Sequence, residues 1–330
     1  MLTASVVTYH TEPEELRRCL QSLLAAPALA WVTVVDNGRE PRIADFLRSA
    51  FAAESASGRI RYRAAQNRGY GAGHNIALRE AVAEGSPLHL VVNSDVRFGA
   101  GVLEHLTAYM EARPDVGQVI PAVRYPDGRP QAVCRLLPTP FDVFARRFLP
   151  AAWIRRRTER YTLAFTGYRT EMNPPYHMGC FMLLRTAALR SVAIIPGGSD
   201  ADDTRSGSDA GRDHGRSDAH SGQPCADAAR EQYFDERFFL YPEDIDLTRR
   251  LHREWRTMFC PDVSIVHDHR AGSYHSLRLL WVHCTNMCRY FGKWGWWHDP
   301  ERTAFNRRLL DELRRAGCTP ADARGRTESE

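Results

Sequence analysis

Three carboxylates stand directly after an apolar, aromatic run late in the chain. The segment "FFLYPEDIDLTRRL", residues 238–251, carries Glu243, Asp244 and Asp246 just past Pro242. Acids at the start of a helix interact favourably with the helix dipole, and proline suits the same position. The aromatic residues beside them would desolvate a carboxyl group and raise its pKa toward the range of a general base. Capping and acid–base catalysis are therefore both open for this segment.

One of these acids has basic partners at helical spacing. Asp246 precedes Arg249 and Arg250 by three and four residues, which predicts an ion pair along the helix. That pair leaves Glu243 and Asp244 to face a cleft, where they could serve in catalysis.

Asp95 and His267 have the chemistry of a divalent-cation site. Asp95 ends the apolar run "LHLVVNSD". A Mg²⁺ or Mn²⁺ ion at a nucleotide diphosphate needs only one or two protein carboxylates, because phosphate oxygens and water fill the other positions. His267 and His269 end another apolar run, and their imidazoles are candidate ligands of the same cation. The structural alternatives are a helix cap at Asp95 and core or capping roles for the histidines.

A glycine-rich segment, "NRGYGAGHN" at residues 67–75, lies between an expected strand and an expected helix. Glycines at such a junction let the backbone approach a phosphate, and helix amides favour anions. The spacing G-x-G-x-G differs from the G-x-G-x-x-G of dinucleotide folds, and it follows the third strand instead of the first. A nicotinamide enzyme is therefore only the runner-up. A tight turn explains the glycines equally well.

The elements that must position these groups alternate in type over roughly the first hundred residues. β-Branched runs at 2–9, 31–37, 59–65 and 88–95 are separated by stretches of helical periodicity. This alternation predicts an α/β fold with a mostly parallel sheet covered by helices on both faces. Ligands bind beyond the carboxyl ends of the strands in such sheets, and the polar residues of this sequence occur there.

Polar residues at the ends of the first two strands are candidates for a nucleotide site. The first strand ends in Thr8 and Tyr9, and the second ends in Asp36 and Asn37. An adjacent carboxylate and amide can accept from and donate to the edge of a nucleobase, whereas a turn needs only one of them. Ligand binding and turn formation both remain open for this pair.

The first helix has a recognisable start. In "TEPEELRRCLQSLL", residues 11–24, Thr11 and Glu14 have the spacing of a capping box, and Pro13 fits the first turn. We therefore expect Thr11 to cap this helix.

Composition divides the chain into unequal parts. Residues 196–230 are rich in Gly, Ser and Asp with hardly any large apolar residue, so this insert cannot offset the entropy of ordering and is expected to be disordered. We expect one α/β domain over 1–274, a helical extension over 275–318 and a disordered tail over 319–330. Within the extension, "HCTNMC" at 283–288 is typical of a packed helix face and is given no function.

The composition also limits the class of protein and its partners. The chain has 330 residues, 43% of them hydrophobic, a net charge of +4, and eight cysteines without a C-x-x-C pair, which indicates a folded enzyme with reduced thiols. No apolar run reaches the length of a membrane span and the start lacks an export signal, so we expect a cytoplasmic protein. Arginines interleave with aromatic residues at 145–161, which suggests a solvated helix face or a peripheral contact with the inner face of the plasma membrane. No nucleic-acid motif accompanies them, so nucleic acid is not an expected partner.

Together these segments resemble the family 2 glycosyltransferases, particularly their bacterial rhamnosyltransferase-like branch. The resemblance runs from about residue 2 to 292 and skips the insert. Its marks, in chain order, are "SVVTYH" with "LRRCLQSL", "VVDNG", "NRGYGAGHN", "VVNSDV", "HMGCFMLLR", "FDERFFLYPEDIDLTRRL" and "VHDHRAGS". The resemblance implies a GT-A fold: a Rossmann-like αβα sandwich for the nucleotide, continuous with an acceptor-facing half and followed by C-terminal helices.

The resemblance also implies roles for individual residues. The positions expected to bind the nucleotide are Thr8, Tyr9, Asp36, Asn37, Asn67, Gly69, Asn75, Asn93 and Asp95. The segment "NSD" occupies the place of the metal-binding D-x-D motif, with Asn93 where the first acid would be.

The metal and the catalytic acids follow from the same resemblance. Asp95 is implied as the metal ligand, and His267 completes the metal shell. Asp244 is implied as the catalytic base, with Glu243 as its partner.

The expected reaction is inverting transfer of a hexose, rhamnose or similar, from a dTDP- or UDP-sugar. The acceptor would be a glycan or a lipid-linked glycan in cell-surface polysaccharide synthesis. A Mg²⁺ or Mn²⁺ ion would neutralise the departing charge, while a base removes the proton of the acceptor hydroxyl. Loops such as 177–180 would form the hexose pocket. A nucleotidyltransferase of similar fold and a non-catalytic nucleotide- or sugar-binding module are the alternatives.

Overall fold

The computed structural model describes residues 1–145, 149–196, 231–268 and 277–319. Almost all of the expected insert and of the expected tail lies outside these residues, as does His269. The two expectations of disorder therefore stay predictions.

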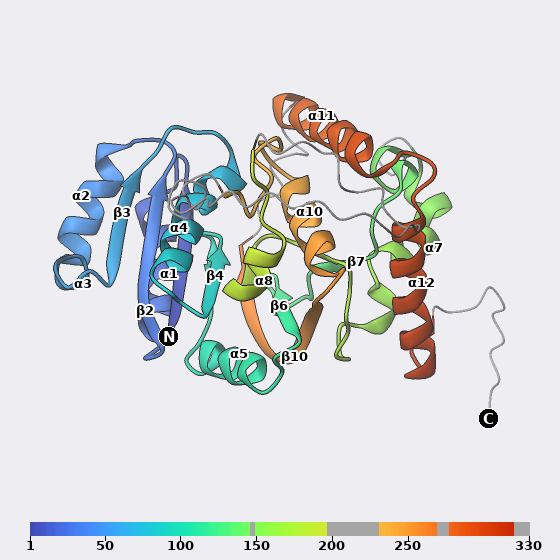
Figure 1. The fold of residues 1–330 in the computed structure, drawn as a ribbon, viewed down its shortest axis with the longest axis horizontal. Coiled ribbons are helices and arrows are strands. Elements are labelled where there is room, and N and C mark those ends of the chain that lie inside the picture. The colour runs from blue at the N-terminus through green and yellow to red at the C-terminus, as the bar shows by residue number, and fades with distance from the viewer. Residues whose placement is uncertain (146–148, 197–230, 269–276, 320–330) are drawn as a thin grey trace, which may run out of the picture.

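A central sheet organises the described part of the chain (Figure 1). Its strands are β1 (Leu2–Thr8), β2 (Leu29–Asp36), β3 (Ile60–Ala64), β4 (Leu88–Val92), β5 (Val96–Arg97), β6 (Val116–Arg124), β9 (Phe181–Arg185) and β10 (Arg256–His267). Within the described residues these eight strands have the order β3-β2-β1-β4-β9-β6-β10-β5. The neighbours from β3 to β4, and also β6 with β10, are parallel. Strand β9 runs antiparallel between β4 and β6, and β5 is antiparallel to β10. The predicted mostly parallel α/β sheet is confirmed.

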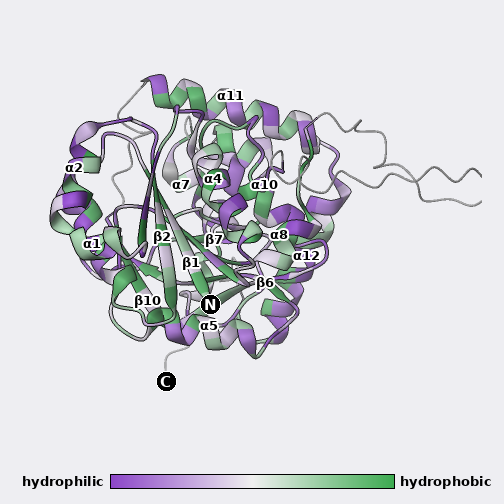
Figure 2. Cartoon of the chain, turned by 60° about the vertical axis from the view of Figure 1, so that its left-hand side comes forward, coloured by the Kyte–Doolittle hydropathy of each residue, from purple (hydrophilic) through white to green (hydrophobic). Residues whose placement is uncertain are grey.

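Helices cover both faces of this sheet (Figure 1). The helices of the described residues, not all of which lie on a face of the sheet, are α1 (Pro13–Leu24), α2 (Pro41–Ala50), α3 (Ala52–Ala56), α4 (Tyr70–Ala83), α5 (Val102–Glu111), α7 (Ala151–Tyr161), α8 (Thr186–Ser191), α10 (Pro242–Leu251), α11 (Leu277–Trp294) and α12 (Pro300–Arg315). Alternate residues of β4 show the two faces, as expected for a strand. Leu90 and Val92 pack in the cluster that includes α1 and α5, whereas Val91 packs with α4, α8 and α10. Figure 2 shows the hydrophobic residues gathered on the central strands.

Smaller elements follow β6. A two-stranded sheet pairs β7 (Cys134–Arg135) with β8 (Tyr176–His177), and between them lie a π-helical turn, Phe141–Ala145, and a 3₁₀ turn, Ala164–Thr166. This region adjoins the carboxyl edge of the main sheet, where it contributes to the candidate site.

Helix α1 does not begin as the sequence suggested. It starts at Pro13, Glu12 occupies the N-cap position, and no side chain makes a capping hydrogen bond there. Thr11 instead closes the turn after β1, where its Oγ1 accepts the N–H of Tyr9. The predicted capping box between Thr11 and Glu14 is therefore wrong, because proline took the first helical position and Thr11 served the preceding turn.

Helix α10 is held in place by buried ion pairs to the C-terminal helices. Asp246 accepts from Arg250 Nε at 2.9 Å and from Lys293 Nζ at 2.6 Å, so the predicted pair of Asp246 forms with Arg250. Arg249 points away from Asp246, and its guanidinium donates to Asp299 at 2.7 and 2.9 Å. Helices α11 and α12 thereby fix the helix on which the two candidate catalytic acids lie.

Arg249→Leu should lower the free energy of unfolding by about 3–5 kcal/mol, because it leaves the buried Asp299 with only the more distant guanidinium of Arg302, at 3.8 Å, for an ion pair. The midpoint of urea unfolding measures the effect. Arg314→Leu is the matched control, since its pair with Asp311 is exposed, and it should change the midpoint little. Equal effects of the two substitutions would contradict the anchoring role of Arg249.

Candidate active site

Two neighbouring cavities lie at the carboxyl edge of the sheet. The Asp95 cavity has a volume of about 540 Å³, and the Asp244 cavity has a volume of about 360 Å³. Both are lined by Tyr70, Asn93 and Leu240, so these residues form a common wall. Asp95 and Asp244 therefore face adjoining cavities that share a wall, not a single chamber.

The structure brings together six of the nine residues expected at the nucleotide. Those lining the Asp95 cavity are Tyr9, Asn37, Asn67, Gly69, Asn93 and Asp95. Thr8, Asp36 and Asn75 are buried and do not line it. The predicted set thus divides into ligand-facing and internal residues.

Asp36 is fully buried and its oxygens are used inside the protein. Oδ1 accepts the N–H of Gly38 at 2.9 Å and the hydroxyl of Thr8 at 3.4 Å. Oδ2 accepts the N–H of Glu40 at 2.7 Å and the hydroxyl of Tyr62 at 2.9 Å. Asp36 therefore fixes the loop after β2. Of the two roles left open by the sequence, turn formation is the one that Asp36 has.

Asn37, the next residue, faces the Asp95 cavity. Its Nδ2 donates to the carbonyl of Gly69 at 3.2 Å, while its buried Oδ1 has no hydrogen-bond partner among the described residues. A buried amide oxygen without a donor costs free energy. Asn37 therefore offers a ligand an acceptor at the carboxyl end of β2.

Asn75 acts as an internal clamp. Its Oδ1 accepts the N–H of Tyr233 at 3.2 Å and of Phe234 at 2.9 Å, and its Nδ2 donates to the carbonyl of Phe234 at 2.8 Å. These bonds fasten the segment before α10 to α4. Asn75 therefore positions the acid-bearing helix and lies away from the cavity.

The glycines of the 67–75 segment serve close packing. Gly69 has φ +109°, and a Cβ added there would lie 2.2 Å from the carbonyl oxygen of Phe239. A Cβ at Gly71 would lie 2.7 Å from Phe234 Cβ, and one at Gly73 would lie 2.8 Å from a methyl group of Val7. Protein atoms therefore fill the space that these glycines leave, which supports the tight-turn alternative over a phosphate cradle.

Asp95 and His267 come together as a pair of candidate metal ligands. Asp95 Oδ1 lies 3.3 Å from His267 Nε2. The same Oδ1 is buried and has no hydrogen bond within the described residues. A carboxylate oxygen and an imidazole nitrogen that point at a common space fit a divalent cation. The residues present therefore suit a Mg²⁺ or Mn²⁺ ion, with Asn93 beside them at 3.5 Å from the imidazole.

Gln131 orients the imidazole of His267. Gln131 Nε2 donates to the carbonyl of His267 at 2.7 Å, so Gln131 Oε1 is the atom that faces His267 Nδ1 at 2.9 Å. The proton of a neutral imidazole must then be on Nδ1, which turns the lone pair of Nε2 toward Asp95 and Asn93, where a metal would bind. Desolvation lowers the pKa of His267, but Cys180 and Asp95 raise it to about 10, so a cation must displace a proton from Nε2. No pattern in the sequence pointed to Gln131.

Glu243 and Asp244 are buried at the start of α10, 3% and 9% exposed. Asp244 accepts the N–H of Gly179 at 2.8 Å and of Ile245 at 2.7 Å. Burial raises the pKa of Asp244 to about 7, although these hydrogen bonds and Arg135 lower it. Burial, and then the charge of Asp244, raise the pKa of Glu243 well above its ordinary range. The pair can therefore hold Glu243 neutral while Asp244 is ionised near neutral pH.

Arg135 is a site residue that sequence reasoning missed. It lines the Asp244 cavity, and its guanidinium lies 5.8 and 5.7 Å from the ring centres of Tyr161 and Tyr176. Within the described residues, no carboxylate forms an ion pair with it. Its positive charge instead favours the ionised form of Asp244.

Tyr70 connects the two cavities through the common wall. Its hydroxyl lies 2.8 Å from both Asn93 Oδ1 and the carbonyl of Gly179, the residue whose N–H binds Asp244. Gly179 and Cys180 line the Asp244 cavity as expected for loop 177–180, whereas His177 is buried and does not. A displacement beside Asp95 can therefore reach Asp244 through short contacts.

Helix α11 covers both cavities. Arg278, Leu279 and Val282 line the Asp95 cavity, whereas His283 and Met287 line the Asp244 cavity. Segment 283–288, which the sequence predicts to be a packed helix face, thus contributes two residues to the site. The helical extension completes the walls of both cavities.

A mostly parallel α/β sheet with such groups at the ends of its strands defines a glycosyltransferase of the GT-A fold. The chain belongs to glycosyl transferase family 2, whose model matches residues 5–191. Membership of this family favours glycosyl transfer over nucleotidyl transfer and over a non-catalytic binding module. The matched region ends before α10, so the roles of Glu243 and Asp244 rest on the geometry above.

One known protein is similar to this chain in sequence, and two are similar in structure. An N-acetylglucosaminyl-diphospho-decaprenol L-rhamnosyltransferase of Mycobacterium tuberculosis is 26% identical over 223 residues, which are 64% of this chain and 58% of that protein. The mannosyltransferase PcManGT from Pyrobaculum calidifontis, solved with GDP-Man and Mn²⁺, has a TM-score of 0.51 at 16% identity over 97% of this chain and 76% of its own. GalNAc-T7, solved with UDP, GalNAc and Mn²⁺, has a TM-score of 0.51 at 9% identity over 82% of this chain and 44% of its own. The solved structures confirm the fold.

Asp244→Asn should stabilise the folded protein above pH 7. Because burial raises the pKa of Asp244 from 3.8 to about 7, the folded chain holds this proton more tightly than the unfolded chain. Stability therefore falls as pH rises from 3.8 to about 7, and the substitution removes that loss. We expect a gain on the order of 2–4 kcal/mol in urea unfolding above this window, and little difference below it.

Asp45→Asn is the control for that measurement, because Asp45 is exposed beside Arg48. Its unfolding curve should match that of the unmodified protein at each pH. A variant at Asp244 that is less stable than the unmodified protein above pH 7 would contradict the buried-charge account.

Proposed function

We propose that this glycosyltransferase moves a hexose, with inversion, from a nucleotide-diphosphate sugar to a hydroxyl of a glycan or lipid-linked acceptor. The observation that carries the proposal is the common wall of the two cavities, with Asp95 on one side and Asp244 on the other. A sugar seated at Tyr70 and Asn93 would have its diphosphate toward Asp95 and its acceptor toward Asp244. Such a placement suits a single displacement at the anomeric carbon.

On the acceptor side, Asp244 is the base. It takes the proton of the attacking hydroxyl as that oxygen bonds to the anomeric carbon and the bond to the diphosphate breaks. A pKa of about 7 suits this task near neutral pH, and the charge of Arg135 favours the ionised form. Glu243 stays protonated and holds the pocket without adding a second negative charge.

On the donor side, Asp95 and His267 would hold Mg²⁺ or Mn²⁺. When bound, the cation supplies positive charge against the departing nucleotide diphosphate. The two solved relatives with Mn²⁺ and a nucleotide or nucleotide sugar support this assignment. Asn37 and Asn67 lie at the nucleotide end of the Asp95 cavity, and Tyr9 offers an exposed ring for stacking on the base.

The mycobacterial relative supports a more specific donor and acceptor. Its name supports rhamnose as the sugar, carried as dTDP-rhamnose or a similar UDP-sugar, and a lipid diphosphate as the anchor of the acceptor. Synthesis of cell-surface polysaccharide would use such an acceptor.

A peripheral contact with the inner face of the plasma membrane would bring the enzyme to a lipid-linked acceptor. Trp153 in α7 is 80% exposed beside Arg155 and Arg156, and Trp281 in α11 is 70% exposed. Exposed tryptophans next to arginines suit the boundary of an anionic bilayer. No helix in the described part of the chain combines the length and the apolar character of a membrane span.

The domain division proposed from the sequence fits this function. In that division, an α/β domain over 1–274 precedes a helical extension over 275–318. Because α11 lines both cavities, the extension serves substrate binding in addition to packing.

Asp244→Asn tests the proposed base. We expect the rate of sugar transfer to fall by about 10²–10⁴-fold, because no base then takes the proton of the attacking hydroxyl. Binding of the nucleotide sugar with Mn²⁺, measured by calorimetry, should persist. Asp115→Asn, an exposed acid before β6, is the matched control and should transfer sugar normally. Near-normal turnover in the Asp244 variant would rule out its role as base.

Gln131→Leu tests the orientation of His267. It removes the acceptor of the Nδ1 proton, so the affinity for Mn²⁺ should fall about 10–100-fold. Titration of Mn²⁺ followed by electron paramagnetic resonance measures this change, and saturating Mn²⁺ should restore transfer. Gln21→Leu, at an exposed position of α1, is the control. Unchanged Mn²⁺ affinity in the Gln131 variant would show that His267 does not depend on this contact.

A further inference from the structure

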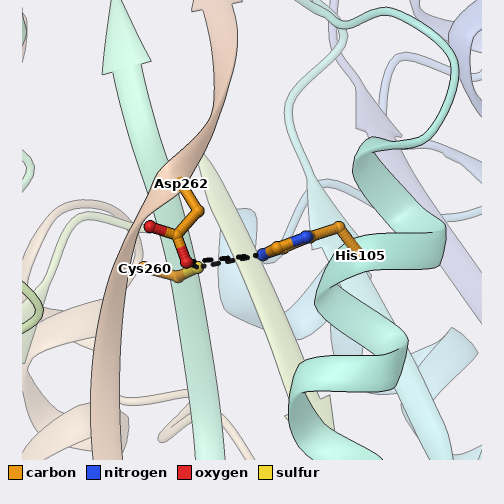
Figure 3. A group of neighbouring side chains, drawn as sticks. All are labelled: His105, Cys260 and Asp262. Carbon is orange, nitrogen blue, oxygen red and sulfur yellow. Dashed lines mark hydrogen bonds and ion pairs between the residues drawn. The ribbon is translucent and has the colours of Figure 1, made fainter.

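A second group of metal-ligating side chains lies away from the active site. His105 on α5 faces Cys260 and Asp262 on β10 (Figure 3). The ligand atoms of the three all lie within 4.8 Å of one another. None of the three lines either active-site cavity. Along the sheet, the group is separated from His267 by roughly 13 Å, or four steps of a β-strand.

The local fold explains why these side chains meet. Strand β10 pairs Cys260 with Pro121 and then Ser264 with Ala122 of β6, so residues 261–263 bulge out of the ladder. Pro121 has no N–H for that ladder, and a bulge is a common response to proline in a strand. The bulge brings an exposed Asp262 beside the buried Cys260, under the helix that carries His105.

The distances within the group are close to those around a tetrahedral ion, although the two sulfur contacts are also within reach of weak hydrogen bonds. His105 Nε2 lies 3.7 Å from Asp262 Oδ2 and 3.7 Å from Cys260 Sγ, and the sulfur lies 3.9 Å from the same oxygen. A nitrogen–oxygen hydrogen bond would be about 2.7–3.2 Å. With Zn–S of about 2.3 Å and Zn–N or Zn–O of about 2.0–2.1 Å, tetrahedral geometry requires ligand separations of about 3.3–3.6 Å. The three atoms therefore surround a common point and need to move only a few tenths of an ångström.

We propose that His105, Cys260 and Asp262 form a zinc site with water as the fourth ligand. The exposed sides of His105 and Asp262, 40% and 65% exposed, leave room for that water and for entry of the ion. Binding transfers the thiol proton of Cys260 to solvent and joins the thiolate to the metal, without any redox change. The thiolate selects Zn²⁺ over the Mg²⁺ or Mn²⁺ that suits Asp95. The ion would brace α5 against β10, the strand that ends in His267.

Titration of the full-length, metal-free protein with Co²⁺ tests the proposal, because a thiolate ligand gives Co²⁺ a charge-transfer band in the near ultraviolet. The unmodified protein should show this band, and added Zn²⁺ should remove it. Cys260→Ser should abolish the band. His105→Gln and Asp262→Asn alter exposed groups and should keep the fold while lowering the affinity at least about tenfold, since even outer-shell partners are worth 10–100-fold.

Other thiols and histidines supply the controls. Cys225→Ser tests the insert, which also contains histidines and acids, and Cys180→Ser tests the thiol beside His267. Both variants should keep the band, and circular dichroism checks that each variant is folded. A band that survives Cys260→Ser, a band lost with Cys225 or Cys180, or no band at excess Co²⁺ would each overturn the site.

Discussion

The burial of two adjacent carboxyl groups at the start of α10 is the constraint on which the rest of this structure depends. Moving even one carboxylate out of water costs several kcal/mol, so a buried acid needs strong support from its surroundings. Here the N–H of Gly179 and the guanidinium of Arg135 favour the ionised form of Asp244. The helix itself is held by Arg249 and Lys293, which link it to α11 and α12. The C-terminal helices therefore hold in place the helix that carries the two buried acids.

The fold could be predicted from the sequence where the signals are local, and the prediction failed where they are not. Long apolar, β-branched runs predicted β1, β2 and β4, because strands buried on both faces need continuous hydrophobic residues. The segment "FMLLR" of β9 also reads as a strand, but its antiparallel pairing was not predicted, since its partner β4 lies about ninety residues earlier. Helix α4 begins at Tyr70 inside the glycine segment, where glycine propensity opposes a helix. Packing of Gly71 against Phe234 and of Gly73 against Val7 overrides that propensity.

The candidate site could be predicted only from the rule that ligands bind beyond the carboxyl ends of parallel strands. That rule located Asp95, Asn37 and His267, because each ends a strand at the same edge of the sheet. It could not find Gln131, whose contact with His267 spans 136 positions and comes from an irregular turn. It also missed Arg135, which lies on a two-residue strand without periodicity.

Some buried oxygens at the cavity walls have no hydrogen-bond donor, a property that they share with a few buried side chains elsewhere, such as Gln118 and Thr248. Asp36 and Asp246 resemble Asp95 in the sequence, yet their oxygens are filled by protein donors, as are those of Asp244. By contrast Asn37 Oδ1 and Glu243 Oε2 are buried and lack a hydrogen-bond partner among the described residues, and Asp95 Oδ1 has only its 3.3 Å contact with His267. Each of these three residues lines one of the two adjoining cavities. Because an unsatisfied buried oxygen destabilises the empty protein, its retention at the cavity walls argues that a ligand or a cation completes it there.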